Sequence, residues 1–170
     1  MSTQAHSNSR SQQTQQHQMY EPHRQDPYQN TKKLSEPTQC PDCGLVYKKG
    51  RWQITSATED IPQAQRCPAC ARIHDKVPAG VLQLSGNFFF EHKEEVLSLI
   101  HHKERDEKNQ HPLERIMSIE ESEGEIRISY TGLHLTRSTG EALHHAYQGK
   151  LSIMHNDHDA PIRVQWQRNS

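Results

Sequence analysis

Two short motifs, Cys40-Pro41-Asp42-Cys43 and Cys67-Pro68-Ala69-Cys70, decide how this chain folds, and they contain all 4 of its cysteines. Each Cys-x-x-Cys motif bends tightly enough to direct two thiolates at one ion, and Gly44 lets the chain turn after the first motif without a Cβ clash. Two such pairs, separated by residues 44–66, are the ligand pattern of a tetrahedral structural zinc site. We therefore predict that Cys40, Cys43, Cys67 and Cys70 bind one Zn²⁺.

Disulfide bonds, thiol redox chemistry and an iron–sulfur cluster are the other uses of such cysteines. The chain opens without a signal peptide, so we expect a reducing compartment, which disfavours disulfides. A thioredoxin-like site would need one motif at the end of a strand in a βαβ unit, whereas two motifs occur here without that pattern. His74 is a further candidate ligand, although four cysteines already fill the shell. A site of four thiolates is saturated, so its binding free energy, on the order of 10 kcal/mol, serves folding rather than catalysis.

The composition of the 170 residues bounds the size and location of the protein. Hydrophobic residues make up 31% and the mean hydropathy is −1.02, so we expect part of the chain to stay unfolded. The formal net charge of −1 excludes a uniformly basic coat for nucleic acid. No apolar run approaches the roughly 18 residues that a membrane helix needs. We expect a cytoplasmic protein without membrane contact and without a small-molecule substrate.

The distribution of apolar residues divides the chain into three segments. Residues 1–37 contain Leu34 but no Val, Ile, Phe or Trp, and they are rich in Gln, Ser, Thr and His, which predicts a disordered tail. Residues 38–78 hold the cysteines and form the predicted zinc module. Residues 79–168 have the periodic apolar patterns of a compact α+β domain.

The order of elements within residues 38–78 predicts a treble-clef module, a form of zinc ribbon. Two short β-prone runs flank Lys48-Lys49-Gly50, which predicts a hairpin after the first cysteine motif. The second motif opens a segment that can form a helix until Pro78 ends it. Cys67 and Cys70 then lie at a helix N-terminus, where the helix dipole favours thiolates.

The same hairpin carries the candidate nucleic-acid-binding residues. Lys48, Lys49 and Arg51 alternate with Tyr47 and Trp52, and such a mixture is typical of surfaces that bind phosphates and stack on bases. The alternative interpretation is that Tyr47 and Trp52 cover the metal site and the cations belong to a solvated turn. The sequence leaves both interpretations open.

Residues 79–168 predict the element order β-α-β-β-α-β-β. The expected strands cover residues 81–84, 113–119, 125–130, 151–154 and 162–166, and the expected helices cover residues 88–102 and 133–147. The polar run 103–110 fits either a frayed helix end or a loop. We expect Asn87 to cap the first helix, Gly149 to end the second, and Gly140 to mark close contact with the sheet. This order matches a ferredoxin-like domain with an added terminal strand, with both helices on one sheet face and Trp166 in the core.

Charge is divided unevenly along the chain. Residues 91–125 contain eleven Asp or Glu and five Lys or Arg, so the first helix and the following hairpin of the α+β domain are acidic. A solvated acidic face is one interpretation, and a surface for protein contact is the other. The histidine pairs at residues 101–102 and 144–145 lack the i,i+4 spacing of a second metal site.

The two cysteine motifs and residues 78–86, 111–117 and 140–149 resemble a group of small, uncharacterised bacterial zinc-ribbon proteins. More distantly, cysteine motifs followed by an α+β domain resemble the zinc-bearing N-terminal part of the large-ribosomal-subunit export adaptor of archaea and eukaryotes. The first resemblance carries no activity, and the second implies association with the ribosome or with ribosomal RNA. Export itself is not implied, because 170 residues leave no room for the adaptor's later domains.

These observations predict a non-enzymatic zinc protein that binds structured RNA or the ribosome through Tyr47, Lys48, Lys49, Arg51 and Trp52. The alternative is a protein–protein adaptor that uses the acidic helix and the exposed face of the sheet. The sequence contains neither the Gly-x-Gly-x-x-Gly motif of dinucleotide binding nor the Gly-x-Ser-x-Gly motif of a nucleophile elbow.

Overall fold

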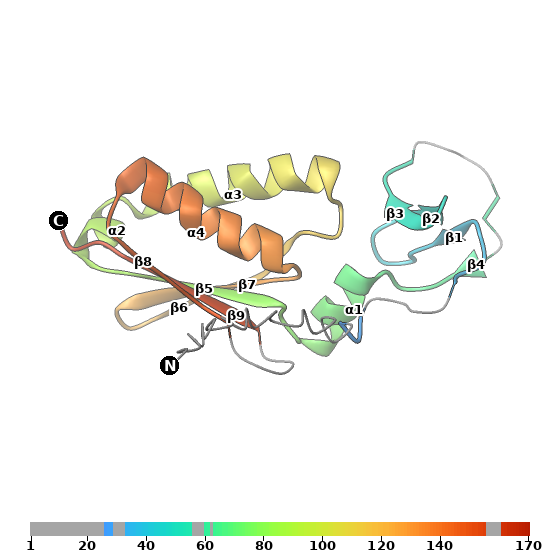
Figure 1. Ribbon diagram of the computed structural model, residues 1–170, viewed down its shortest axis with the longest axis horizontal. Helices are drawn as coiled ribbons and strands as arrows, with labels where there is room; N and C mark the ends of the chain where they lie inside the picture. The colour runs from blue at the N-terminus through green and yellow to red at the C-terminus, as the bar shows by residue number, and fades with distance from the viewer. Residues whose placement is uncertain (1–25, 29–32, 56–59, 62, 156–160) are drawn as a thin grey trace, which may run out of the picture.

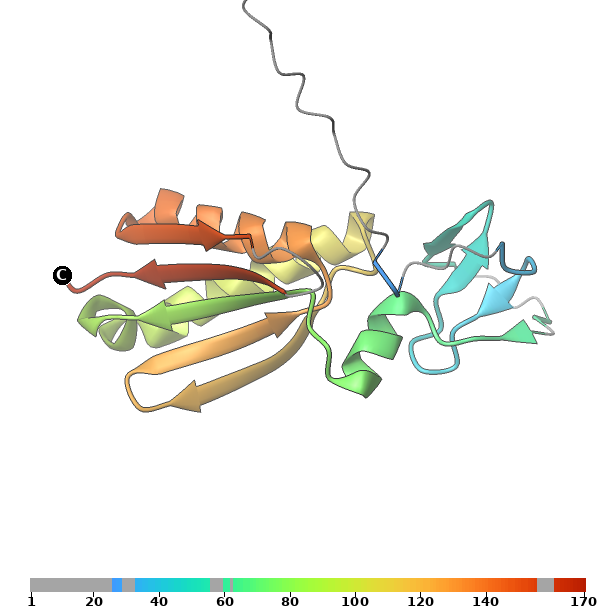
Figure 2. The same cartoon turned by 60° about the horizontal axis from the view of Figure 1, so that its bottom comes forward.

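Two sheets, one small and one larger, organise the described part of the chain, which comprises residues 26–28, 33–55, 60–61, 63–155 and 161–170 of the computed structural model. The four-stranded sheet lies at one end of the molecule, and the five-stranded sheet with its helices forms the other end (Figure 1). The chain passes from the first to the second through a short helix, α1 (Figure 2).

The small sheet belongs to the module that holds the cysteines. Its strands are β1 (Thr38–Gln39), β2 (Val46–Lys48), β3 (Arg51–Gln53) and β4 (Gln63–Ala64), in the order β3-β2-β1-β4. β2 and β3 form the predicted hairpin, and positive φ angles at Lys49 and Gly50 make its tight turn. Cys67 caps α1 (Pro68–Asp75), and Pro68 occupies a position where a helix tolerates a missing N–H. The predicted hairpin and the predicted helix after the second motif are therefore confirmed.

The larger sheet belongs to the α+β domain. Its strands are β5 (Gly80–Ser85), β6 (Ile116–Ser122), β7 (Glu125–Tyr130), β8 (Lys150–Met154) and β9 (Ile162–Gln167). Helices α2 (Asn87–Glu91) and α3 (Lys93–Gln110) connect β5 to β6, and α4 (Leu133–Tyr147) connects β7 to β8. α3 and α4 lie side by side over one face of the sheet, as predicted (Figure 1). None of the described helices is both long enough and apolar enough to span a membrane.

The main core lies between this sheet and its helices. Buried residues alternate with outward-facing ones along β7, where Ile126, Ile128 and Tyr130 point inward. Trp166 on β9 is fully buried, as predicted, and its Nε1 donates a hydrogen bond of 2.7 Å to the carbonyl oxygen of Gln148. The helices contribute Phe89, Val96, Ile100, Leu135 and Leu143.

The predicted order of elements along the chain is confirmed, but the last two strands are placed differently from a ferredoxin-like domain. In that topology the strand after the second helix pairs with the first strand. Here β9 pairs in parallel with β5 and β8 lies outside it at the edge, which gives the order β6-β7-β5-β9-β8. β9 has three fully alternating buried residues, Ile162, Val164 and Trp166, whereas every residue of β8 is half-buried or exposed. The more apolar strand therefore takes the covered central position.

The first helical segment of the α+β domain also differs from the prediction. Asn87 lies inside α2 and makes no capping hydrogen bond, because Gly86, with a φ of 101°, takes the N-cap position. The segment breaks at His92 and then continues as α3 through the polar run 103–110. Side-chain pairs one turn apart, such as His102 with Asp106 at 3.2 Å, lie along this exposed part of the helix. The second helix, α4, has the predicted bounds.

The predicted tail, residues 1–37, lies mostly outside the described residues, and its described part contacts the cysteine module. The Arg72 guanidinium on α1 donates to Asp26 at 2.6 Å and lies 4.4 Å from the centre of the Tyr28 ring. Leu34 packs beside the cysteines, and Glu36 accepts hydrogen bonds from the hairpin turn. The module thus uses residues that precede the predicted boundary at residue 38.

The surroundings of Gly140 show how closely α4 approaches the sheet. A Cβ added to Gly140 would lie 2.5 Å from Val164 Cγ1 and 3.2 Å from Leu151 Cδ1. Alanine is favoured over glycine in a helix by about 1 kcal/mol, but the overlap with the sheet reverses this preference. We expect Gly140→Ala to lower the free energy of unfolding by about 1–3 kcal/mol, measured by urea unfolding.

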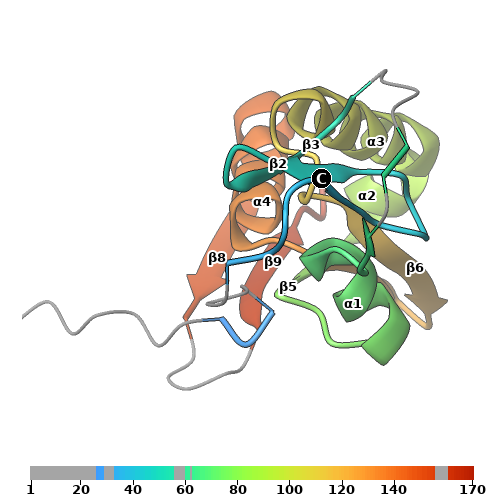
Figure 3. The same ribbon diagram turned by 90° about the vertical axis from the view of Figure 1, so that its right-hand side faces the viewer.

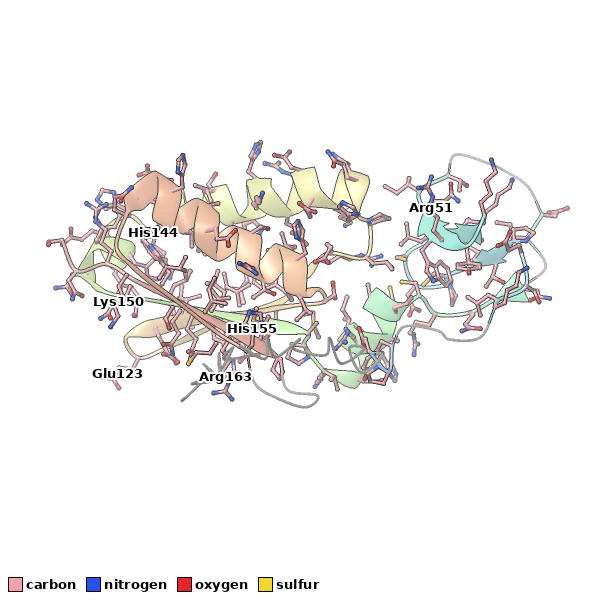
Figure 4. All side chains as sticks on the ribbon, in the orientation of Figure 1. Arg51, Glu123, His144, Lys150, His155 and Arg163 are labelled. Atoms are coloured by element: carbon pink, nitrogen blue, oxygen red, sulfur yellow. The ribbon has the colours of Figure 1, made fainter. Side chains whose placement is uncertain are left out.

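His144→Ala is the matched control, because His144 is exposed on the same helix (Figure 4). This change should alter the free energy of unfolding by less than about 0.5 kcal/mol. A Gly140→Ala protein whose midpoint of urea unfolding equals or exceeds that of the native protein would contradict the close contact between α4 and the sheet.

Candidate metal centre

The four predicted ligand residues converge in the cysteine module. The sulfur cluster, defined as the Sγ atoms of Cys40, Cys43, Cys67 and Cys70, has every sulfur within 4.8 Å of the others, and all four cysteines are free thiols. Cys43 Sγ and Cys67 Sγ, one from each motif, are 3.7 Å apart. A tetrahedral zinc ion with Zn–S bonds of about 2.3 Å requires sulfurs about 3.8 Å apart. The sulfur cluster therefore has the size and the donors of a tetrahedral zinc site.

Backbone hydrogen bonds hold both motifs in place. In the first motif, Cys40 N–H donates to the Leu45 carbonyl at 2.8 Å and Gly44 N–H donates to the Cys40 carbonyl at 2.9 Å. Gly44 has a φ of 78°, which confirms the predicted glycine turn. In the second motif, Cys67 Sγ accepts from the N–H of Cys70 at 3.4 Å as the N-cap of α1. These N–H groups and the helix dipole favour negatively charged sulfurs.

Apolar side chains cover most of the sulfur cluster. Three of the cysteines are buried and Cys43 is exposed. Leu45 and Trp52 are buried against the cysteines, and the Tyr47 ring meets the Trp52 ring edge-on at 5.6 Å. Trp52 is only 8% exposed, so in this position it offers no free ring face to a base. This corrects its predicted role in stacking and agrees with the alternative interpretation that the aromatic residues cover the metal site.

The predicted cations lie on the outer side of the module. Lys48, Lys49 and Arg51 are exposed around the turn of the β2–β3 hairpin. Figure 3, viewed from the end of the molecule that carries the module, shows β2 and β3 in front of α3 and α4, and Figure 4 places Arg51 in this module. Tyr47 is half-buried beneath them. The structure thus gathers the three cations on one hairpin and separates them from Trp52.

Arg115, which the sequence did not assign to the site, completes it. This arginine comes from the loop before β6 in the α+β domain and is 8% exposed. Its Nη1 donates to Cys70 Sγ at 3.4 Å, and its Nη2 donates to Cys43 Sγ at 3.3 Å and to Cys67 Sγ at 3.8 Å. Four thiolates around a divalent ion carry a net charge of about −2. The guanidinium offsets part of that charge from outside the ligand shell.

Arg115 is itself held by its own domain. Its Nε donates to the Pro112 carbonyl at 2.9 Å, and its backbone N–H donates to Thr131 Oγ1 at 2.8 Å. The Thr131 hydroxyl donates in turn to the Leu113 carbonyl at 2.6 Å. Leu113 packs against the apolar neighbours of the cysteines. The loop before β6 is therefore fixed both to the sheet and to the sulfur cluster.

The surroundings of three cysteines, Cys43, Cys67 and Cys70, shift the pKa values of their thiols. Burial raises the pKa of Cys67, and it raises the pKa of Cys70 despite hydrogen bonds with Cys67 and Arg115. Burial also acts to raise the pKa of Cys43, but the Leu45 backbone N–H and the Arg115 guanidinium lower it to about 7. On Arg115, burial acts to lower the pKa, and its hydrogen bonds with the thiols outweigh that effect. A bound cation would supply the charge that holds all four sulfurs as thiolates.

A cavity beside Cys43 gives access to the sulfur cluster. Its volume is about 310 Å³, and it lies where the cysteine module meets the end of α3 and the loop before β6. The residues that line it are Cys43, Gly44, Leu45, Ile54, Thr55, Lys108, Pro112 and Arg115. Because a metal site needs an access path, this opening suits the exchange of an ion.

His74, the histidine considered as a further ligand, lies apart from the sulfur cluster. His74 is exposed, and its Nδ1 is 3.0 Å from Asp75 Oδ1. Within the described ranges, the four cysteines are the one group of three or more His, Cys, Asp or Glu side chains that come this close together.

Comparison with known proteins adds no relative: no family model matches the chain, and no match is found among curated proteins or solved structures. Of the predicted zinc-ribbon resemblance, the structure shows the four-cysteine cluster. Fold and site together define a two-part α+β protein with a candidate zinc centre.

Cys67 provides the most direct test of the ligand set, because it is fully buried and caps α1. We expect the native chain to bind one Zn²⁺. Cys67→Ser should lower the zinc affinity by more than the roughly 10–100-fold that loss of an outer-shell partner costs. Competition with a chromophoric chelator measures both affinities.

Asp42→Asn is the matched control within the first motif. The Asp42 carboxylate points to the surface and pairs with Arg66 at 2.5 Å, so its loss should leave zinc affinity close to native. Native affinity in the Cys67→Ser protein would show that the sulfur cluster is not the zinc site.

Proposed function

We propose that this protein is a non-enzymatic zinc protein whose treble-clef module presents a binding hairpin to structured RNA, with the ribosome as the expected context. A four-thiolate site has no open coordination position, which suits an ion that stabilises the fold rather than one that performs chemistry. The single observation that carries the RNA proposal is the exposure of Lys48, Lys49 and Arg51 together on one hairpin.

The hairpin is held rigidly from both sides, which suits a binding element. Val46 and Trp52 are both buried, and they lie on opposite faces of the hairpin. At its tip, the Glu36 carboxylate accepts hydrogen bonds from Lys49 N–H at 3.0 Å and Gly50 N–H at 2.8 Å. A surface that is already ordered loses less conformational entropy when it binds.

The positions of the aromatic rings favour recognition of RNA shape over sequence. Trp52 is buried, and Tyr47 is the half-buried ring that remains next to the cations. Lysine and arginine side chains contact phosphates, and phosphate contacts position a protein without reading bases. Structured RNA is recognised largely in this way, through its shape and its backbone.

A protein–protein adaptor is the second candidate, and the sheet face opposite α3 and α4 favours it. Neighbouring positions on β7, β5 and β9 carry Arg127, Gln83 and Gln165, and Gln165 Nε2 donates to Gln83 Oε1 at 2.8 Å. Arg163, two residues before Gln165 on β9, is exposed on the same face (Figure 4). Such a flat polar face can hydrogen-bond to a partner chain.

Removing two hairpin cations tests the RNA proposal. Lys48→Ala/Lys49→Ala leaves the sulfur cluster untouched and should weaken binding to a structured ribosomal RNA fragment at low salt. We expect the slope of log K against log salt to fall in magnitude by about 1–2, because each lost phosphate contact releases about one counterion fewer. Fluorescence anisotropy over a range of salt concentrations gives the slope.

Arg127→Ala/Arg163→Ala is the matched control, since it removes two positive charges from the sheet face instead. Its RNA affinity should stay close to native. An equal loss in both double variants would show that the hairpin is not the contact surface. Absence of the native protein from ribosomal fractions at low salt would overturn the RNA proposal and leave the adaptor.

A further inference from the structure

We infer that the zinc site also joins the two parts of the protein: through Arg115, metal binding fixes the α+β domain against the cysteine module. This inference rests on the zinc site proposed above and adds a second consequence of its occupancy. Arg115 is then a positioning residue, which acts on the ion through the sulfurs and on the sheet through its backbone.

Few other contacts hold the two parts together. Among the described helices and strands, none from the cysteine module packs broadly against one from the α+β domain. The chain connection is the short segment between the end of α1 at Asp75 and the start of β5 at Gly80. The loop before β6 supplies the non-covalent link, through Leu113 on the apolar side and Arg115 on the sulfurs.

The charges favour this link when the site is loaded. Arg115 is buried, and no carboxylate among the described residues forms an ion pair with it. Its charged side therefore faces the sulfurs, while its Nε is satisfied by the Pro112 carbonyl. Charge-assisted hydrogen bonds are stronger than neutral ones, and burial strengthens them further.

The geometry makes the link depend on the ion. The guanidinium reaches sulfurs from both motifs, Cys43 from the first and Cys67 and Cys70 from the second. We expect these three sulfurs to separate when the metal ion is removed, because the ligands of a structural zinc site are rarely gathered in an unfolded module. Removing the ion therefore removes the shared target of Arg115, and the loop before β6 loses its anchor on the module.

Replacing Arg115 tests the inference in the full chain. Arg115→Gln removes the charge, and we expect zinc affinity to fall by about 10–100-fold, as for other outer-shell partners. The sulfur-to-cobalt charge-transfer band of the Co²⁺-substituted protein should shift, because the sulfurs lose charged hydrogen-bond donors. Amide hydrogen exchange of the zinc-loaded protein should rise in residues 113–116 and at Thr131.

Arg115→Lys and Arg127→Gln make the result specific. Lysine keeps the charge but lacks the planar fork, so Arg115→Lys should recover part of the affinity and little of the exchange protection. If Arg115→Gln does not fold with zinc, Arg115→Lys carries the same comparison. Arg127→Gln removes an exposed arginine of the same domain and should match the native protein in all three measurements.

The outcomes separate this inference from the zinc site itself. Native-like affinity, cobalt band and exchange in Arg115→Gln, with one zinc still bound, would overturn the role of Arg115 and leave the zinc site standing. A native chain that binds no zinc would overturn both.

Discussion

Gathering four sulfurs at one point is the constraint on which the cysteine module depends. Its described core consists of Leu45, Trp52, Ala69 and three of the cysteines, with Leu34, Tyr47 and Leu113 at the margin. So small an apolar cluster cannot offset the conformational entropy of the ordered chain, whereas zinc binding contributes on the order of 10 kcal/mol in comparable modules. A zinc ion bound by the four cysteines would therefore stabilise this module as an apolar core stabilises a larger domain. The hairpin with its three cations packs against the cysteines through Trp52.

The two parts of the protein differ in what holds them together. The α+β domain has a contiguous core that extends from Leu82 and Trp166 in the sheet to Val96 and Leu143 in the helices, and it needs no ion for that core. Arg115 lies where these two kinds of stabilisation meet, because its backbone belongs to the domain and its guanidinium belongs to the site. Loss of the ion should therefore affect the module first and the domain only through the loop before β6. A partner that contacts both parts would sense whether the site is loaded.

The sequence predicts most of this architecture where the signal is local. Cysteine spacing within each motif identifies the ligands, and the apolar periodicity of α4 gives its bounds, because both signals depend on residues close together in the sequence. Arg115 follows no spacing rule, since it lies 45 residues from Cys70 and becomes a neighbour only through the fold. Residues 111–117, which contain Arg115, are singled out only by the resemblance to zinc-ribbon proteins, and that resemblance gives the arginine no role. The central position of β9 could have been predicted from the sequence. Its strict alternation of apolar and polar residues marks a covered strand more clearly than the pattern of β8 does. The burial of Trp52 depends on the sulfur cluster that it covers, which a linear pattern of cations and aromatics does not show.

X-ray absorption at the zinc edge of the purified full chain tests the central claim most directly. An ion held by Cys40, Cys43, Cys67 and Cys70 predicts four sulfur neighbours at about 2.3 Å and no nitrogen or oxygen in the first shell. A first shell with nitrogen or oxygen neighbours, or a chain that carries no stoichiometric zinc, would contradict it.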